Sequence, residues 1–243
     1  MAQPYLSLVI ACYNEEEILL ESFAEIRETL LELKRPFEVI FVDDVSRDRT
    51  RELLGRIAAE NRDLDLRVIL HDANKGRGAT VSDGFRAARG EIAGYLDVDL
   101  EVHCRYIPSL VQAIEKGADV ATVRRIYAFQ VRNLDRYFMS RGYSWLVREL
   151  LKTKLHDTET GFKFFRRQKL LPVLEATRDP SWFWDTEFMI RAEKHGCLIR
   201  EVPGAYVRRS DKTSTVNGLR DSLHYLAKLW RFRATLKKRS ADG

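Results

Sequence analysis

The chain has 243 residues, of which 45% are hydrophobic and 32% charged, and this composition excludes disorder as its dominant state. With 41 basic and 36 acidic side chains the net charge is +5, a mild excess that argues against a nucleic-acid-binding groove. The three cysteines and five histidines are scattered without metal-ligand spacing, so we expect a reducing compartment and no site built from cysteine or histidine.

No segment of the sequence predicts a membrane span or a signal peptide. The apolar runs fall short of the ~20 residues that cross a bilayer. The opening "MAQPYLSLVIACYNEEE" lacks the basic region of a signal peptide. If this protein works at a membrane, we therefore expect it to be cytoplasmic and peripheral on the cytoplasmic face, attached through its own surface or through a membrane-anchored partner, as a monomer or a homo-oligomer.

The first hundred residues alternate short β-rich runs with helical patterns. The β-rich runs cover residues 6–12, 37–44, 66–71 and 91–99. Nearly continuous apolar strands between helices predict an α/β fold, with a mostly parallel sheet covered by helices on both faces. Ligands of such sheets bind beyond the carboxyl ends of the strands, so we expect the polar groups that follow three of these runs to form one site.

The stretch "YLDVDLEV", residues 95–102, places Asp97, Asp99 and Glu101 at every second position of an apolar run. On a strand these side chains point to one face, and three negative charges in one patch repel each other unless a cation lies among them. Mg²⁺ and Mn²⁺ bind carboxylates together with phosphate oxygens, so we predict a site for one of these ions. A solvated strand face at a sheet edge is the alternative.

Two other predicted strand ends carry groups suited to a nucleotide. In "IACYNEEE" Tyr13 can stack on a base, and in "VIFVDDVSRDRT" Asp44 can accept a hydrogen bond from a ring N–H. Helix capping is the alternative role for Asp43 and Ser46. A doubled aspartate exceeds what one cap needs, which favours a binding role for one of the two.

The stretch "NKGRGAT" combines Gly76 and Gly78 with Lys75 and Arg77 ahead of a predicted helix. Glycines let a backbone approach a phosphate closely, and a helix N-terminus attracts anions. The stretch matches neither the Walker pattern nor G-x-G-x-x-G, and an ordinary turn into a helix explains it equally well.

From residue 124 to 154 the chain carries eight basic side chains against two acidic ones, interleaved with aromatic residues. Arg132, Arg136 and Ser140 follow the spacing of one helix face, and arginine suits bidentate contacts to phosphate. The pattern predicts a phosphate-binding face, with a plain charged helix surface as the alternative. Further on, Asp185 stands at the start of a predicted helix, as its N-cap or as a catalytic base.

Residues 218–239 have the pattern of a basic amphipathic helix, with leucines and Trp230 on one stripe. Such helices lie on anionic membrane surfaces, although packing on the core or on a partner subunit explains the stripe equally well. We therefore divide the chain into a main α/β domain, residues 1–215, and a C-terminal helical extension, residues 216–243.

Taken together, "ACYNEEE", "FVDDVSRDRT", "NKGRGATVSDGFRAARGEIAGYLDVDLE" and "DTETGFKFFRR" resemble family 2 glycosyltransferases, most of all the group that transfers sugars to polyprenyl phosphates. The resemblance runs from about Leu6 to about Ser214 and keeps the motifs in order and spacing. It implies a GT-A (Rossmann-like) fold and an inverting transfer from a nucleotide-diphosphate sugar to a dolichyl or undecaprenyl phosphate.

The resemblance also implies roles for individual residues. The donor-binding set is Ala11, Tyr13, Glu15, Asp44, Lys75, Gly76, Asp97, Val98, Arg208 and Lys212. The set at the metal, Mg²⁺ or Mn²⁺, is Asp97, Asp99 and Glu101. The set at the acceptor phosphate is Arg124, Arg136, Ser140 and Arg141.

Two alternatives to this function remain open. The first is transfer to a sugar hydroxyl in a polysaccharide or glycan, which needs a base, and Asp157 or Asp185 would supply it. The second is a nucleotide-binding module without catalysis. Val45, where the family's "DDGS" motif usually has glycine, and a shortened "VRRSDKTST" loop point in that direction.

Overall fold

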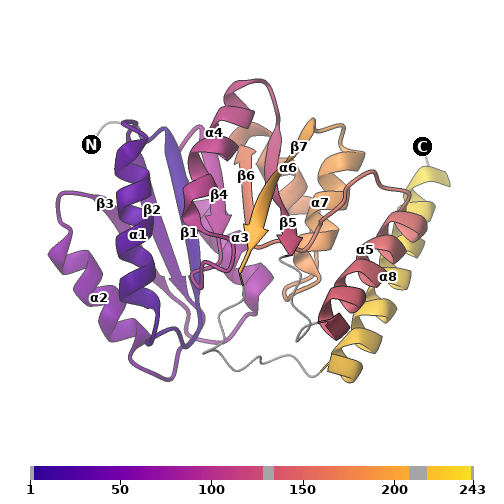
Figure 1. The fold of residues 1–243 in the computed structure, drawn as a ribbon, viewed down its shortest axis with the longest axis horizontal. Helices are drawn as coiled ribbons and strands as arrows, with labels where there is room; N and C mark the ends of the chain where they lie inside the picture. Colours follow the sequence, from indigo (N-terminus) through magenta and orange to yellow (C-terminus); the bar gives the residue numbers. More distant parts are fainter. Residues whose placement is uncertain (1–2, 128–133, 208–217, 242–243) are drawn as a thin grey trace.

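The computed structural model describes residues 3–127, 134–207 and 218–241, which build one sheet with helices packed around it (Figure 1). The sheet has seven strands in the order β3-β2-β1-β4-β6-β5-β7. Their bounds are β1 Leu6–Cys12, β2 Phe37–Asp43, β3 Asp65–Leu70, β4 Ile92–Leu96, β5 Val120–Tyr127, β6 Phe162–Arg166 and β7 Ile199–Tyr206. Neighbouring strands are parallel except where β6 runs antiparallel to β4 and β5. The predicted mostly parallel α/β sheet is confirmed.

Helices cover both faces of this sheet. They are α1 Leu19–Glu32, α2 Thr50–Glu60, α3 Arg77–Ala87, η1 Cys104–Tyr106, α4 Ile107–Glu115, α5 Leu134–Leu151, α6 Arg167–Ala176, α7 Trp184–Lys194 and α8 Gly218–Ala241. One apolar core joins α1, α2 and α4 to one face, and a second joins α3, α6 and α7 to the other. Alternation along β1 feeds both cores, because Leu8 and Ile10 enter the first and Val9 enters the second.

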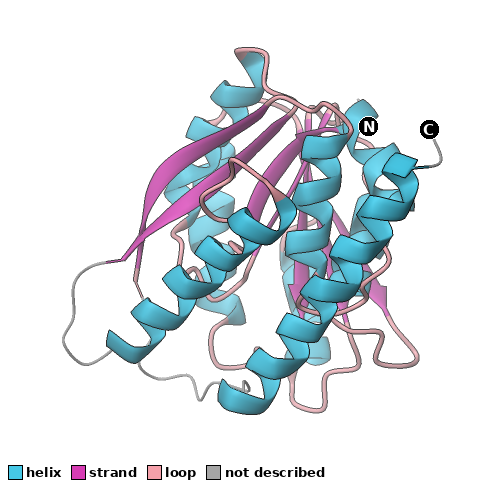
Figure 2. Ribbon diagram, turned by 90° about the vertical axis from the view of Figure 1, so that its right-hand side faces the viewer, coloured by secondary structure: helices cyan, strands magenta, loops and turns pink. Residues whose placement is uncertain are grey.

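The two longest helices, α5 and α8, lie side by side beyond the end of the sheet (Figures 1 and 2). Leu229 and Phe232 of α8 are buried in a cluster with Val147 of α5. The rings of Tyr143 and Tyr225 meet edge to face with their centroids 5.3 Å apart. The C-terminal helix thus packs on the rest of the chain, which was one of the alternatives for its apolar stripe.

Membrane spans are not found in the described part of the chain. None of its helices combines the length and the apolar composition that crossing a bilayer requires.

Candidate active site

The chain segments predicted to form the site lie together at the carboxyl ends of the parallel strands, which we call the carboxyl edge of the sheet. Strands β1, β2 and β4 run in parallel and end together at this edge, toward the bottom of Figure 1. Because β6 runs the opposite way, the segment before it, residues 157–161, begins at the same edge. The backbone N–H of Asp97 donates to the carbonyl of Gly161 at 2.8 Å and joins the two segments.

The acidic stretch after β4 is a turn, and the strand predicted for residues 91–99 is too long. β4 ends at Leu96, and Leu100 has a left-handed backbone with φ of 52°. The alternation of three carboxylates therefore does not place them on one strand face. The prediction failed because the alternation of apolar and acidic residues continues past Leu96, where the chain leaves the sheet. The sequence pattern therefore does not mark the end of the strand.

Each carboxylate of the acidic turn has its own surroundings. Asp97 accepts from Nη2 of Arg77 at 2.6 Å, and Asp99 accepts from the backbone N–H of Glu101 at 3.2 Å. Glu101 accepts from the hydroxyl of Tyr206, on β7, at 2.6 Å. In the described ranges these three residues do not form a group whose ligand atoms all lie close enough for one ion. Asp97 and Asp99 are partly exposed at the edge.

Asp97 is seated tightly against the segment that leads into β6. A Cβ at position 161 would lie 1.7 Å from Oδ2 of Asp97, so any larger residue there would displace the carboxylate. Gly161 therefore leaves the space that one carboxylate oxygen of Asp97 occupies.

Arg77, at the start of α3, links Asp97 to Asp185 by bonding both carboxylates. Asp185 also accepts from Nζ of Lys163 at 2.6 Å and from the hydroxyl of Tyr95. Burial alone would raise the pKa of Asp185, but the two cations outweigh it and lower that pKa. Asp185 is thus a buried anion with both oxygens engaged. It is not the N-cap, because α7 begins one residue earlier.

A second ion-pair cluster lies at the end of β5. Arg125 donates to Asp157 through Nε at 2.7 Å and Nη2 at 2.9 Å, and it lies 3.4 Å from Glu159. Burial works to raise the pKa of Asp157, yet Arg125 prevails and the pKa is lowered. For Glu159 burial prevails: with repulsion from Asp157 and Asp185 it raises the pKa to about 7, against the pull of Arg125. Glu159 is therefore a carboxyl that exchanges its proton near neutral pH.

Asp44, predicted to bind a base, is buried and holds the loop between β3 and α3. It accepts from the backbone N–H groups of Lys75 at 2.8 Å and Gly76 at 2.9 Å, and Nδ1 of His71 lies 2.9 Å away. Burial would raise the pKa of Asp44, but these bonds lower it. Nζ of Lys75 pairs with Asp83 at 2.7 Å. The structure thus brings three predicted donor residues together, in contact with each other.

The glycines of "NKGRGAT" allow the segment around Pro180 and Trp184 of the same chain to pack closely against the start of α3. A Cβ at Gly76 would lie 2.7 Å from the carbonyl oxygen of Pro180, and one at Gly78 would lie 2.4 Å from the side chain of Trp184. The same carbonyl accepts a hydrogen bond from the N–H of Ala79 at 3.0 Å. The segment before α7 thus packs against both glycines and accepts a hydrogen bond from one amide of the helix start. The phosphate contact at this helix start stays a prediction.

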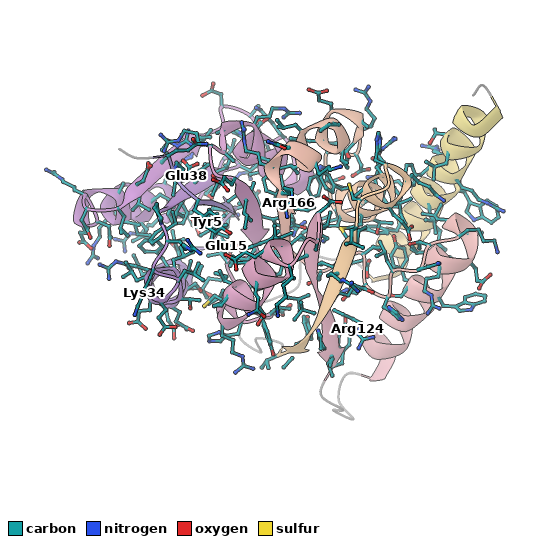
Figure 3. All side chains as sticks on the ribbon, turned by 90° about the horizontal axis from the view of Figure 1, so that it is seen from above. Tyr5, Glu15, Lys34, Glu38, Arg124 and Arg166 are labelled. Atoms are coloured by element: carbon teal, nitrogen blue, oxygen red, sulfur yellow. The ribbon has the colours of Figure 1, made fainter. Side chains whose placement is uncertain are left out.

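The other predicted residues are spread along the edge. Ala11 lies in β1, Tyr13 follows it with 43% of its surface exposed, and Val98 is buried, so only its backbone is available to a ligand. Glu15 lies just before α1, whereas Arg124 lies on the side of β5 that faces α5 (Figure 3). Among the described residues Arg124 has no ion-pair partner.

Five predicted residues fall outside the description. The side chains of Arg136, Ser140 and Arg141, all within α5, are not described, and Arg208 and Lys212 lie outside the described residues altogether. Their roles stay predictions.

Sequence reasoning gave no role in the site to five residues of the two ion-pair clusters: Arg77, Tyr95, Arg125, Lys163 and Glu159. Lys163 carried a signal, because a lysine inside the apolar run "GFKFF" requires a buried anion beside it. Glu159 carried none, since its pKa depends on neighbours that come from β5 and α7.

The family model described as "Glycosyl transferase family 2" matches residues 7–172, more than half of the chain. The chain belongs to this family. Among solved structures, glucosyl-3-phosphoglycerate synthase from Mycobacterium tuberculosis, in complex with Mn²⁺, UDP and glucosyl-3-phosphoglycerate, has a TM-score of 0.69 at 19% identity. The match covers 95% of this chain and 80% of that one. The expected GT-A fold is thereby confirmed.

Of three similar proteins, two are named for transfer to lipid phosphates. Undecaprenyl-phosphate 4-deoxy-4-formamido-L-arabinose transferase of Pseudomonas aeruginosa is 35% identical over 88% of this chain and 61% of its own length. Dolichyl-phosphate beta-glucosyltransferase of Saccharomyces cerevisiae is 27% identical over 82% and 66%. Glycosyltransferase AglD of Haloferax volcanii is 35% identical over 90% of this chain but only 35% of its own length. The chain thus spans between about a third and two thirds of these relatives.

Proposed function

We propose that this family 2 protein is an inverting glycosyltransferase that moves a sugar from a nucleotide-diphosphate sugar to a polyprenyl phosphate. The observation that carries the proposal is the pairing, at one sheet edge, of an acidic turn with Asp97 and Asp99 and a strand end with Arg124, a guanidinium without a described partner. The first suits a donor diphosphate with its cation, and the second suits an acceptor phosphate. The relatives named for lipid-phosphate acceptors support the same assignment.

The residues present fit a divalent cation, Mg²⁺ or Mn²⁺, at Asp97 and Asp99. Both residues are partly exposed, and the bonds from Arg77 to Asp97 go to Oδ1 alone. One or two carboxylates with substrate phosphate oxygens are a usual Mg²⁺ environment. A bound cation supplies charge stabilisation to the departing diphosphate. Glu101 accepts a hydrogen bond from Tyr206 and holds the turn in place, and we do not assign it as a ligand of the ion.

The protein's own contribution is to hold two anionic substrates in line. Arg124, together with Arg136 from α5, binds the acceptor phosphate and aims one of its oxygens at the anomeric carbon. That oxygen forms the new bond as the bond to the diphosphate breaks on the opposite face, which inverts the configuration. A phosphate dianion is a sufficient nucleophile, so no strong base is needed. Because the acceptor is a lipid, we place the reaction at a membrane surface.

Transfer to a sugar hydroxyl, the first alternative, needs a general base, and the two residues predicted for this role are weak proton acceptors. Asp157 and Asp185 are both buried, bonded to cations and lowered in pKa, so neither accepts a proton readily. Glu159, with its pKa of about 7, is the better base for such an acceptor. The second alternative, a nucleotide-binding module without catalysis, does not explain why the acidic turn and Arg124 lie at the same end of the sheet.

The test is mass spectrometry of a reaction with a panel of nucleotide sugars, a short polyprenyl phosphate and Mn²⁺ or Mg²⁺, with an EDTA control. We expect a metal-dependent lipid-phosphate-sugar product. Asp99→Asn and Arg124→Ala should each lower the rate on the order of a hundredfold. Arg56→Ala, which removes an exposed ion pair with Glu60 on α2, is the matched control and should leave the rate unchanged.

Two outcomes contradict the proposal. Product formed only on a sugar hydroxyl would move the acceptor to the rival class. Full activity of Arg124→Ala combined with Arg136→Ala would remove the lipid-phosphate assignment even if a product were seen.

A further inference from the structure

Trp182 is an exposed tryptophan beside the ion pairs of the site. It is 52% exposed, and Cζ of Arg77 lies 5.0 Å from the centroid of its ring. Trp145 and Trp230 are exposed to a similar extent, but Trp145 lies on α5 and Trp230 on α8, where it contacts Arg233. Single exposed apolar side chains are common, so the position of Trp182 next to Arg77 is what calls for an explanation.

The loop that carries Trp182 is fixed from three sides. Asp179 accepts from the backbone N–H of Ser181 at 2.9 Å, and its own N–H donates to Glu187 of α7 at 2.8 Å. Lys228 of α8 pairs with Asp179 at 2.6 Å and donates to Ser181 at 3.0 Å. The carbonyl of Pro180 holds the start of α3, as described above. A loop held in this way presents its indole with little conformational entropy left to lose on binding.

One guanidinium separates this indole from the acidic turn. Arg77 stacks under Trp182 and also donates to Asp97 at 2.6 Å. In a nucleotide-diphosphate sugar the anomeric carbon is bonded directly to the diphosphate. A diphosphate held at Asp97 and Asp99 therefore brings its sugar ring next to Arg77 and Trp182.

We propose that the indole of Trp182 is a stacking platform for the pyranose ring of the donor sugar. The C–H face of a pyranose is apolar and flat and suits an aromatic face, while Arg77 and Asp97 offer polar partners to hydroxyls at the ring's edge. An isoprenoid chain fits less well, because it would desolvate these charged groups without replacing their hydrogen bonds. This assignment rests on the proposed function and extends it to the sugar subsite.

The test compares binding of a nucleotide-diphosphate sugar and of the nucleoside diphosphate alone by titration calorimetry, without acceptor. Trp182→Ala should weaken binding of the sugar nucleotide about tenfold and leave the nucleoside diphosphate unchanged. Trp182→Phe, which keeps an aromatic face, should recover most of the affinity. Trp145→Ala is the matched control and should change neither titration.

Three results would overturn the stacking role. Two come from the titrations: unchanged sugar-nucleotide affinity in Trp182→Ala, or an equal loss for both ligands. The third comes from the transfer assay with acceptor, and it is a higher KM for the polyprenyl phosphate at unchanged sugar-nucleotide affinity, which would assign the indole to the lipid. If the wild-type protein bound no sugar nucleotide of the panel, the proposed function would fail and the subsite with it. Binding by the wild type with no effect of Trp182→Ala would remove the subsite alone.

Discussion

At the scale of single residues, Asp185 shows how a buried charge becomes a hub of the structure. Its carboxylate bonds Arg77, Lys163 and Tyr95, and the side chain of Lys163 is completely buried. Burial lowers the pKa of Lys163, with Asp185 acting against this. Ions buried in this way are tolerated only because each has a partner of opposite charge. The network also fixes Arg77, which reaches both Asp97 and Trp182.

Replacing Asp185 should mainly lower the stability of the fold, with a smaller direct effect on the rate of sugar transfer. In Asp185→Asn two buried cations lose their anion, and we expect the free energy of unfolding to fall by about 3–5 kcal/mol. Denaturant unfolding measures it. The double variant with Lys163→Met should lose less than the sum of the single variants, because one unpaired cation has been removed. An unchanged unfolding free energy in Asp185→Asn would contradict this structural role.

Glu159 makes stability depend on pH near neutrality. Its pKa rises from 4.5 to about 7 on folding, so between these values the folded chain keeps a proton that the unfolded chain has released. Its contribution to stability is complete below about pH 4.5 and is lost as the pH rises through about 7, a change of up to about 3 kcal/mol. Glu159→Gln removes the effect. The difference in unfolding free energy between wild type and variant, measured from pH 5 to pH 8, should therefore shift in favour of the variant, and a constant difference would contradict the assignment.

At the scale of elements, α3 and the segment before α7 fit together only because two positions lack side chains. Gly78→Ala would drive a methyl group into Trp184, and we expect it to cost about 1–3 kcal/mol. Gly55→Ala is the matched substitution in α2, where a Cβ meets nothing within 4 Å. It should stabilise by ~0.5–1 kcal/mol, the usual gain from replacing a helical glycine. Thermal unfolding of both variants compares them, and equal shifts would mean that the Trp184 contact does not constrain α3.

The elements that local pattern determines were predictable, and those that depend on distant partners were not. The runs that became β1 and β2 are continuous apolar segments with turn residues after them, and the structure places them within a residue of the prediction. The end of β4 was missed, because "YLDVDLEV" keeps its alternation beyond Leu96 although the chain turns there. The direction of β6 depends on where its partners lie and has no signature in "GFKFF".

The candidate site divides in the same way. The sequence indicated which strand ends carry its carboxylates, because that follows from the order of the elements. It did not indicate that Asp44 bonds the "NKG" loop or that Arg77 bridges Asp97 and Asp185, since these contacts join segments far apart in the chain. Contacts between residues that are far apart in the sequence produce no regular sequence spacing from which they could be predicted.

At the scale of the whole molecule, α8 is part of the packed structure. Leu229 is fully buried against α5 and α7, whereas its neighbour Trp230 is 55% exposed. Leu229→Ala should lower the free energy of unfolding by about 2–5 kcal/mol and Trp230→Ala by less than ~0.5 kcal/mol. Urea titrations of the two variants make the comparison. Similar small effects would mean that α8 contributes little to the fold and is free to serve as an independent membrane helix.

The antiparallel strand β6 has a consequence for how the chain is made on the ribosome. Strands β1 to β4 are synthesised first and pair with one another, but the open side of β4 is covered only when Phe162–Arg166 have emerged. Until then an apolar nascent strand presents unpaired N–H and C=O groups to other chains. The interval includes the whole of α4, β5 and α5. Translation pauses within it would therefore lengthen the period in which the growing protein is open to misassembly and to capture by chaperones.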